Sequence, residues 1–122
     1  LPMLKREKMD KVICDETGRE LPKEIVDLIL KNEEKLDDAL EIVKLLANPT
    51  RLKIAFLLSK NELCTCDLEK ILDKEQTLIS HYIRAFKDLD LLDERRDGKW
   101  RYYSINGQKL KRLINVMMAE GE

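Results

Sequence analysis

The sequence of 122 residues has little of what a secreted, membrane-spanning or catalytic protein needs. No apolar run approaches the roughly 20 residues that a bilayer-spanning helix requires, and no signal-peptide pattern opens the chain. One histidine, no nucleophile beside a base and no glycine-rich phosphate loop leave nothing from which an active site could be assembled. We therefore expect a cytoplasmic protein that does not contact membranes, is not an enzyme and uses no organic cofactor.

A strong charge of one sign is also missing. The net charge is −1, so any basic surface for a nucleic acid must be local. Residues 1–50 carry nine basic and twelve acidic side chains, and the remaining residues carry fourteen and twelve. The second part of the chain is thus the more basic one, although the difference is a weak signal.

The three cysteines, Cys14, Cys64 and Cys66, are an odd number in a chain without a secretory signal. A disulfide framework is not expected in a reducing compartment. These thiols are therefore buried apolar residues, metal ligands or redox groups.

What the sequence does contain is helical periodicity. Residues 1–22 show no sustained period and are predicted to form an arm outside the core. From Lys23 apolar residues recur every three or four positions up to Ala47, which predicts a long helix. Asn32 marks a candidate break within it, and Asn48-Pro49 ends it because the residue before proline avoids helical geometry.

Three short helices are predicted next, over residues 49–59, 65–72 and 76–89. Two candidate strands then flank Asp97-Gly98, a dipeptide suited to a tight hairpin turn, and a last helix covers residues 107–119. Two close helices followed by a hairpin form a winged helix-turn-helix, so the predicted fold is mainly α with a β-hairpin wing, over residues 23–122. The apolar helices at 23–47 and 107–119 are expected to pair between the subunits of a homodimer.

Four segments carry a family resemblance. Residues 46–54, reading LANPTRLKI, resemble the opening motif of the ArsR/SmtB family of metal-responsive repressors, and ELCTCDL at 62–68 resembles the cysteine box of its arsenic, cadmium and lead sensors. ISHY at 79–82 and the hairpin sequence at 94–103 are similar to the family's recognition helix and wing. The resemblance implies a repressor that binds double-stranded operator DNA and dissociates when a thiophilic metal or metalloid ion binds.

The candidate DNA contacts follow from this arrangement. The outward positions of the second helix of the motif enter the major groove, where Gln and Arg read adenine and guanine. Basic wing residues would follow the phosphate backbone, although neighbouring acids dilute that signal. The expected contacts are Gln76, Thr77, Ser80, His81, Arg84, Arg95, Arg96, Lys99 and Arg101.

Cys64 and Cys66 are the candidate metal ligands. They fall where the helix of residues 65–72 should begin, and a helix start is expected to lower thiol pKa values and so to favour the thiolate that soft metals need. The alternative is two small apolar residues at a helix start. The resemblance implies a third sulfur, for which Cys14 of the arm is the candidate, with a bystander thiol as its alternative.

Two other functions stay open at this point. The cysteines could form a redox switch on the same DNA-binding fold, or the chain could be a winged-helix interaction module without a metal. Arsenite, antimonite, cadmium and lead all suit thiolate ligands, so the sequence does not select the ion.

Overall fold

The computed structural model describes residues 12–13, 18 and 20–119. Cys14, a predicted ligand, lies outside the described residues. The chain divides into two compact units, Leu1–Leu40 and Glu41–Glu122, which are described separately below. None of the helices in the described part of the chain is both long and apolar enough to cross a bilayer.

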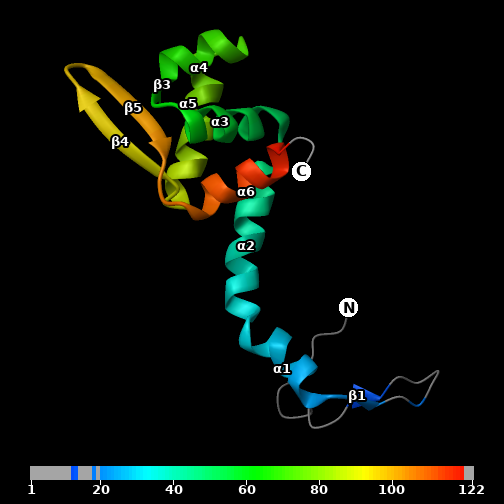
Figure 1. Cartoon of the computed structure of the whole chain (residues 1–122). Coiled ribbons are helices and arrows are strands. Elements are labelled where there is room, and N and C mark those ends of the chain that lie inside the picture. The colour runs from blue at the N-terminus through cyan, green and yellow to red at the C-terminus, as the bar shows by residue number, and fades with distance from the viewer. Residues whose placement is uncertain (1–11, 14–17, 19, 120–122) are drawn as a thin grey trace. The chain divides into compact units, whose positions relative to one another are not determined.

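The first unit contains a short antiparallel pair of strands and helical segments (Figure 1). Strand β1 (Val12–Ile13) pairs with β2 (Glu20–Leu21), and α1 (Lys23–Lys31) follows directly. The side-chain amide of Asn32 donates to the carbonyl of Leu28 at 2.7 Å, which closes the last turn of α1 before α2 (Glu33–Leu46) begins. The predicted break at Asn32 is confirmed.

The second unit begins within α2 and contains the winged helix-turn-helix. Helix α3 (Pro49–Lys60) has Asn48 as its N-cap and Pro49 in its first turn, where proline lacks only a hydrogen bond that the helix could not make. Helices α4 (Thr65–Leu72) and α5 (Gln76–Asp88) form the helix-turn-helix, and α6 (Lys109–Met118) closes the fold. The predicted bounds of these four helices agree with the observed bounds to within two residues.

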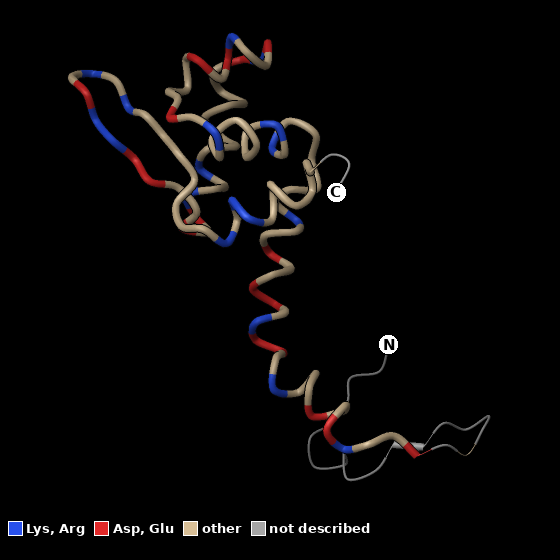
Figure 2. The backbone as a smooth tube through the Cα atoms, in the orientation of Figure 1, with Lys and Arg blue, Asp and Glu red and all other residues tan. Residues whose placement is uncertain are grey.

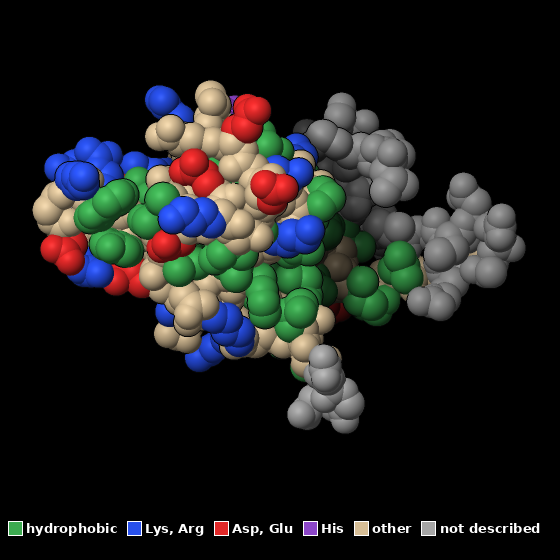
Figure 3. Space-filling model, turned by 90° about the horizontal axis from the view of Figure 1, so that it is seen from above, with side chains coloured by type: hydrophobic (Ala, Val, Ile, Leu, Met, Phe, Trp, Pro, Cys, Tyr) green, Lys and Arg blue, Asp and Glu red, His purple; other side chains and the backbone are tan. Residues whose placement is uncertain are grey.

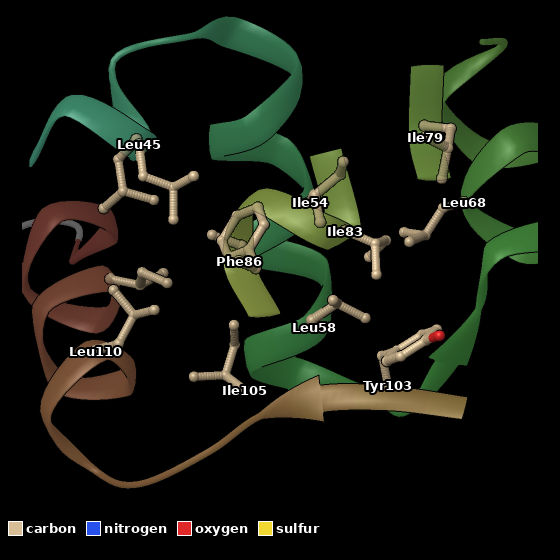
Figure 4. Packing of buried hydrophobic residues seen from close by; sticks show 13 residues of the cluster. Leu45, Ile54, Leu58, Leu68, Ile79, Ile83, Phe86, Tyr103, Ile105 and Leu110 are labelled. Carbon is tan, nitrogen blue, oxygen red and sulfur yellow. The ribbon is translucent and has the colours of Figure 1, made fainter. Parts of the chain in front are cut away.

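One hydrophobic core holds the second unit together. Figure 4 shows Phe86 of α5 between side chains of the other helices and Ile105 of the sheet, and Phe86 is fully buried. Ile79 and Ile83 of α5 and Leu68 of α4 belong to the same cluster, so the buried face of α5 is fixed by packing. The opposite face of α5 is thereby directed to solvent.

The wing is part of a sheet with a third strand that the sequence did not predict. Strand β5 (Trp100–Ile105) lies between β4 (Leu92–Asp97) and the two-residue β3 (Leu63–Cys64), and both pairs are antiparallel. The predicted turn at Asp97-Gly98 is wrong by one residue, because Asp97 pairs with Trp100 and the loop is Gly98-Lys99. Gly98 has a φ of 62°, which glycine adopts without strain as the first residue of such a loop.

Candidate nucleic-acid interface and cysteine box

The exposed face of α5 carries five of the predicted DNA contacts. All five are solvent-exposed, whereas Ile79 and Ile83 of the same helix are buried. They fall in the first nine residues of α5, the part of a recognition helix that reaches base edges. These five residues are Gln76, Thr77, Ser80, His81 and Arg84.

Contacts centred on Arg51 and Asn48 join α5 to the neighbouring helices. The Arg51 guanidinium donates to the carbonyl oxygens of Leu45 at 2.6 Å and Lys44 at 3.3 Å, at the end of α2, and lies 5.4 Å from the ring centroid of Tyr82 on α5. The Asn48 side-chain amide is 3.5 Å from the Tyr82 hydroxyl oxygen. The end of α2, the start of α3 and the middle of α5 are thereby joined next to His81.

The wing carries its basic side chains on two different faces. Directly opposed residues of an antiparallel pair project to the same face, and successive residues alternate. Arg96 is opposed to Arg101, on the face that also carries the buried Tyr103. Arg95 is opposed to Tyr102 on the other face. The wing arginines that the sequence grouped together are therefore separated by the pleat.

Arg96 and Arg101 form a basic pair near the tip of the wing (Figure 2). Their only described acidic neighbour on that face is Glu94, whose carboxylate is 3.8 Å from the Arg96 guanidinium. Burial tends to raise the pKa of Glu94, but Lys87 at 3.4 Å and further donors, including Tyr103, leave it below its ordinary value. Basic side chains also gather over the wing in the space-filling view of Figure 3.

Arg95 is engaged within the chain. Its Nε donates a hydrogen bond to Oε1 of Glu62 at 2.9 Å, and its Nη2 is 2.8 Å from the same oxygen. The guanidinium also lies 4.8 Å from the ring centroid of Tyr102. Lys99 of the turn lies 5.1 Å from the ring centroid of Trp100. Of the four basic wing residues expected to contact DNA, Arg95 thus has the strongest partner within the molecule.

A groove runs between α5, the start of α4 and the wing. Its lining includes Ser80 and Arg84, which are predicted DNA contacts, together with Lys87, Thr65 and Tyr103. The groove therefore joins the exposed face of α5 to the wing face that carries Arg96 and Arg101.

The cysteine box lies at the predicted helix start. Cys64 is the N-cap of α4 with an extended backbone, and its N–H donates to the Asp67 carboxylate at 3.1 Å. The backbone N–H of Asp67 in turn donates to the Cys64 side chain, which completes a capping box. Cys64 is buried, Cys66 is half-buried, and both are free thiols. The structure thus confirms the position of the box, with Cys64 outside the regular helix.

The expected effect of the helix start on the thiol pKa is wrong for Cys64. Burial raises the pKa of the Cys64 thiol, and the Asp67 carboxylate acts in the same direction. The backbone N–H of Asp67 lowers it without compensating for the burial. The free N–H groups of the helix start are therefore outweighed by burial and by the Asp67 carboxylate.

The donor set of the box fits a soft ion only in part. Thiols are the ligands that thiophilic metals select, and the extended backbone at Cys64 removes the helical geometry that would separate residues two apart. Among the described residues, however, no three or more His, Cys, Asp or Glu side chains are grouped so as to hold a metal ion. The two thiols are therefore not a complete ligand set within the described part of the chain.

Three residues around the box were not predicted to matter. Glu62, Tyr102 and Asp67 contact Arg95 or cap the box, and all three lie inside the segments quoted for the resemblance. The acid three residues after Cys64 is a capping-box signature that could have identified Asp67. The contact between Glu62 and Arg95 links positions 33 residues apart and had no local signal.

Comparison with known proteins shows which protein family this chain is similar to. Residues 48–94 match the family described as bacterial regulatory protein, arsR family. A cadmium resistance transcriptional regulatory protein CadC homolog of Staphylococcus aureus is 37% identical over 63% of this chain and 64% of its own length. An arsenical resistance operon repressor of the same species is 37% identical over 60% of this chain and 70% of its own length.

A solved structure supports the same assignment. The homodimeric winged helix-turn-helix DNA-binding domain Mb0332 from Mycobacterium bovis superposes with a TM-score of 0.65 at 30% identity, over 71% of this chain and 81% of that one. These relatives are regulators, in agreement with the expectation that the chain is not an enzyme. The chain belongs to the ArsR family of bacterial regulatory proteins.

Proposed function

We propose that this chain is a cytoplasmic, homodimeric repressor that binds operator DNA and releases it when a thiophilic metal or metalloid ion binds to Cys64 and Cys66. The observation that carries the proposal is the placement of two free thiols at the start of α4, within the same unit as an exposed polar face of α5. The helix that begins at the thiols packs directly against the proposed recognition helix.

Support for the DNA interface comes from the wing. Like charges directly opposite each other in a strand pair destabilise the pair, and Glu94 is one acid beside the two cations Arg96 and Arg101, so a second anion bound by both arginines would stabilise this part of the wing. A DNA phosphate is such an anion, and Lys99 of the turn would reach the same backbone. The exposed face of α5 would then supply the base contacts, with Arg84 and Gln76 as the best hydrogen-bonding side chains.

Support for a homodimer comes from apolar side chains that remain at the surface. Leu113, Val116, Met117 and Met118 of α6 are exposed by 40% to 75%, and α1 and α2 expose further leucines and isoleucines. Such faces mark interaction sites on soluble proteins. Two recognition helices are also needed to read two half-sites about one helical turn apart.

Support for a metal effector comes from the donor chemistry and from the printed names of relatives. Relatives are named for cadmium and arsenical resistance, and thiolates suit both kinds of ion. When bound, such an ion would supply a positive charge that stabilises the thiolate form of its cysteine ligands. Cys64 and Cys66 would hold it, and we propose Cys14 as the third sulfur.

The DNA part of the proposal is tested by titrating a labelled palindromic operator. Arg84→Ala should weaken binding by about 1–3 kcal/mol for each half-site and relax the sequence preference at one position of each half-site. Lys53→Ala, which removes an exposed basic side chain of α3, is the control and should bind almost as wild type. Equal affinity of wild type and Arg84→Ala for all base substitutions would contradict the placement of α5 in the groove.

The metal part is tested by ultraviolet thiolate-to-metal absorption with cadmium or arsenite under reducing conditions. Cys64→Ser and Cys66→Ser should each abolish most of the absorption, and Cys14→Ser should lower the affinity while leaving part of the band. Unchanged absorption in both box variants would show that the sulfur ligands lie elsewhere. A response of DNA binding to oxidant in place of metal would favour the redox alternative.

A further inference from the structure

The three-stranded sheet links the cysteine box to the wing in a way that the helix-turn-helix alone does not. Strand β3 ends at Cys64 and pairs with β5, which in turn pairs with β4 of the wing. Cys64 is opposed to Tyr102, and Tyr102 is opposed to Arg95. Because opposed residues share a face, these three side chains form one row across the sheet.

An ion pair between Glu62 and Arg95 connects the two ends of this row. Glu62, two residues before Cys64, accepts two contacts from the Arg95 guanidinium at 2.8 and 2.9 Å, and the guanidinium lies 4.8 Å from the Tyr102 ring centroid. Strands β3 and β4 are not hydrogen-bonded neighbours, because β5 lies between them. The Glu62–Arg95 pair therefore spans the middle strand and ties the wing to the segment that carries the box.

The burial of Cys64 makes this connection sensitive to what happens at the sulfur. Cys64 is only 7% exposed, so any group that attaches to its sulfur must displace neighbouring atoms. Tyr102 is its opposed neighbour on β5 and lies beside Arg95. A displacement at Cys64 can thus reach the wing through the sheet, without passing through α4 and α5.

We propose that Glu62 and Arg95 are a positioning pair that couples the cysteine box to the wing. When a group attaches to the Cys64 sulfur, the displacement is passed through Tyr102 and Arg95 and moves the wing. Arg95 in this role positions Arg96 and Arg101 and does not itself need to contact DNA. The inference names the regulation of the proposed DNA interface and rests on the proposed function for its biological consequence. The coupling itself is a property of the folded chain and is tested without metal or DNA.

The experiment measures how fast Cys64 reacts with iodoacetamide, an uncharged alkylating agent, in the full chain carrying Cys14→Ser and Cys66→Ser. Coupling is reciprocal, so releasing the wing should expose the thiol. Glu62→Gln and Arg95→Gln should each raise the alkylation rate by about a factor of two to five, the range that an exposed ion pair can supply. Asp93→Asn, which removes one acid from β4 and so changes the charge as Glu62→Gln does, is the matched control and should leave the rate unchanged.

The signs of the two changes separate coupling from simple electrostatics. Glu62→Gln and Arg95→Gln alter the local charge in opposite directions, so an electrostatic effect on the thiol would move the two rates in opposite directions. Coupling through the pair moves both rates upward. Opposite shifts, or no shift in either variant, would overturn the proposal.

A second readout comes from Trp100, the only tryptophan of the chain, which lies in β5 two residues before Tyr102. Alkylation of Cys64 should change the emission of Trp100 when the pair is intact, and the change should be largely lost in Glu62→Gln and kept in Asp93→Asn. A purely stabilising ion pair would alter the melting temperature without altering this response. An equal response in Glu62→Gln and Asp93→Asn would contradict the coupling.

Failure of the proposed function is distinguishable from failure of this inference. If metals do not release the operator but both alkylation results are obtained, the coupling stands and the effector assignment is wrong. If metals release the operator but the alkylation results fail, the signal travels by another route, for which the contact of α4 with α5 is the next candidate.

Discussion

The core around Phe86 and the outer face of α6 are built from the same kinds of side chain and have opposite environments. Phe86, Ile79 and Ile105 are almost completely buried within one chain, whereas Val116 is 75% exposed and Met117 is 51% exposed. A helix can bury its apolar face inside its own subunit or against another molecule. The sequence pattern is the same in both cases, and the burial seen in the structure distinguishes them. The winged unit is thus stabilised by its own core, while the apolar outer face of α6 stays exposed in the single chain, as the proposed homodimer requires.

The largest effect is expected in the core. Phe86→Ala should lower the free energy of unfolding by about 3–5 kcal/mol, because it removes a fully buried ring from the centre of the cluster. Urea denaturation followed by circular dichroism measures this. Val116→Ala is the comparison, and its effect should depend on protein concentration because it acts on association. A concentration-independent loss of similar size in Val116→Ala would remove the distinction between the two faces.

Association should break when charge is placed on the outer face of α6. Val116→Glu should shift the monomer–dimer equilibrium toward monomer by about 2 kcal/mol or more, since an unpaired carboxylate would be buried on pairing. Sedimentation at micromolar concentration measures the shift, and an unchanged circular dichroism spectrum shows that the fold is kept. Lys109→Glu, at the start of the same helix, is the control. A dimer as stable as wild type would place the interface elsewhere.

The two faces of the wing offer a finer comparison. Arg96→Ala should lower the salt dependence of operator binding by about two units of slope, because the homodimer loses one phosphate contact in each subunit. Arg95→Ala should leave that slope almost unchanged, because its guanidinium is engaged with Glu62. Measuring affinity at several salt concentrations separates the variants. The reverse order of the two slopes would assign the phosphate contact to Arg95.

The smallest effect concerns Glu94, whose carboxylate lies 3.4 Å from the Lys87 ammonium. Its pKa is lowered in the folded chain, because Lys87 and other donors outweigh the opposing effect of burial. The stabilisation is therefore fully present above the ordinary carboxyl pKa of about 4.5 and is lost as the pH falls through the lower folded pKa. Glu94→Gln should cost at most about 1 kcal/mol at neutral pH and nothing at the acid end of this window. A difference that grows toward low pH would contradict the sign.

Local signals in the sequence were enough for the helices and for the exposed face of α5. The repeat of Ile79, Ile83 and Phe86 located the buried face, and the five predicted contacts lie on the other side. Asn48-Pro49 located the boundary between two helices because its effect is local, since the residue before proline avoids helical geometry. These features depend on residues within a few positions of each other.

The contacts that connect the site could not be predicted in the same way. Strand β3 has two residues, too few for an alternating pattern, and it exists because β5 supplies its hydrogen bonds. The turn was misplaced by one residue because Asp97-Gly98 and Gly98-Lys99 both offer glycine at a turn, and only the pairing of Asp97 with Trp100 decides between them. The raised pKa of Cys64 likewise results from burial, which the position at a helix start does not reveal.

The central claim is that Cys64 and Cys66 control DNA binding without taking part in it, and operator release by metal tests this most directly. Operator labelled with a fluorophore is bound by wild type, Cys64→Ser and Cys66→Ser, and cadmium or arsenite is then added while the anisotropy is followed. We predict that all three proteins bind the operator with similar affinity and that only wild type is released. Normal release from both serine variants with every thiophilic ion tested would contradict the claim and make the box a structural element of the fold.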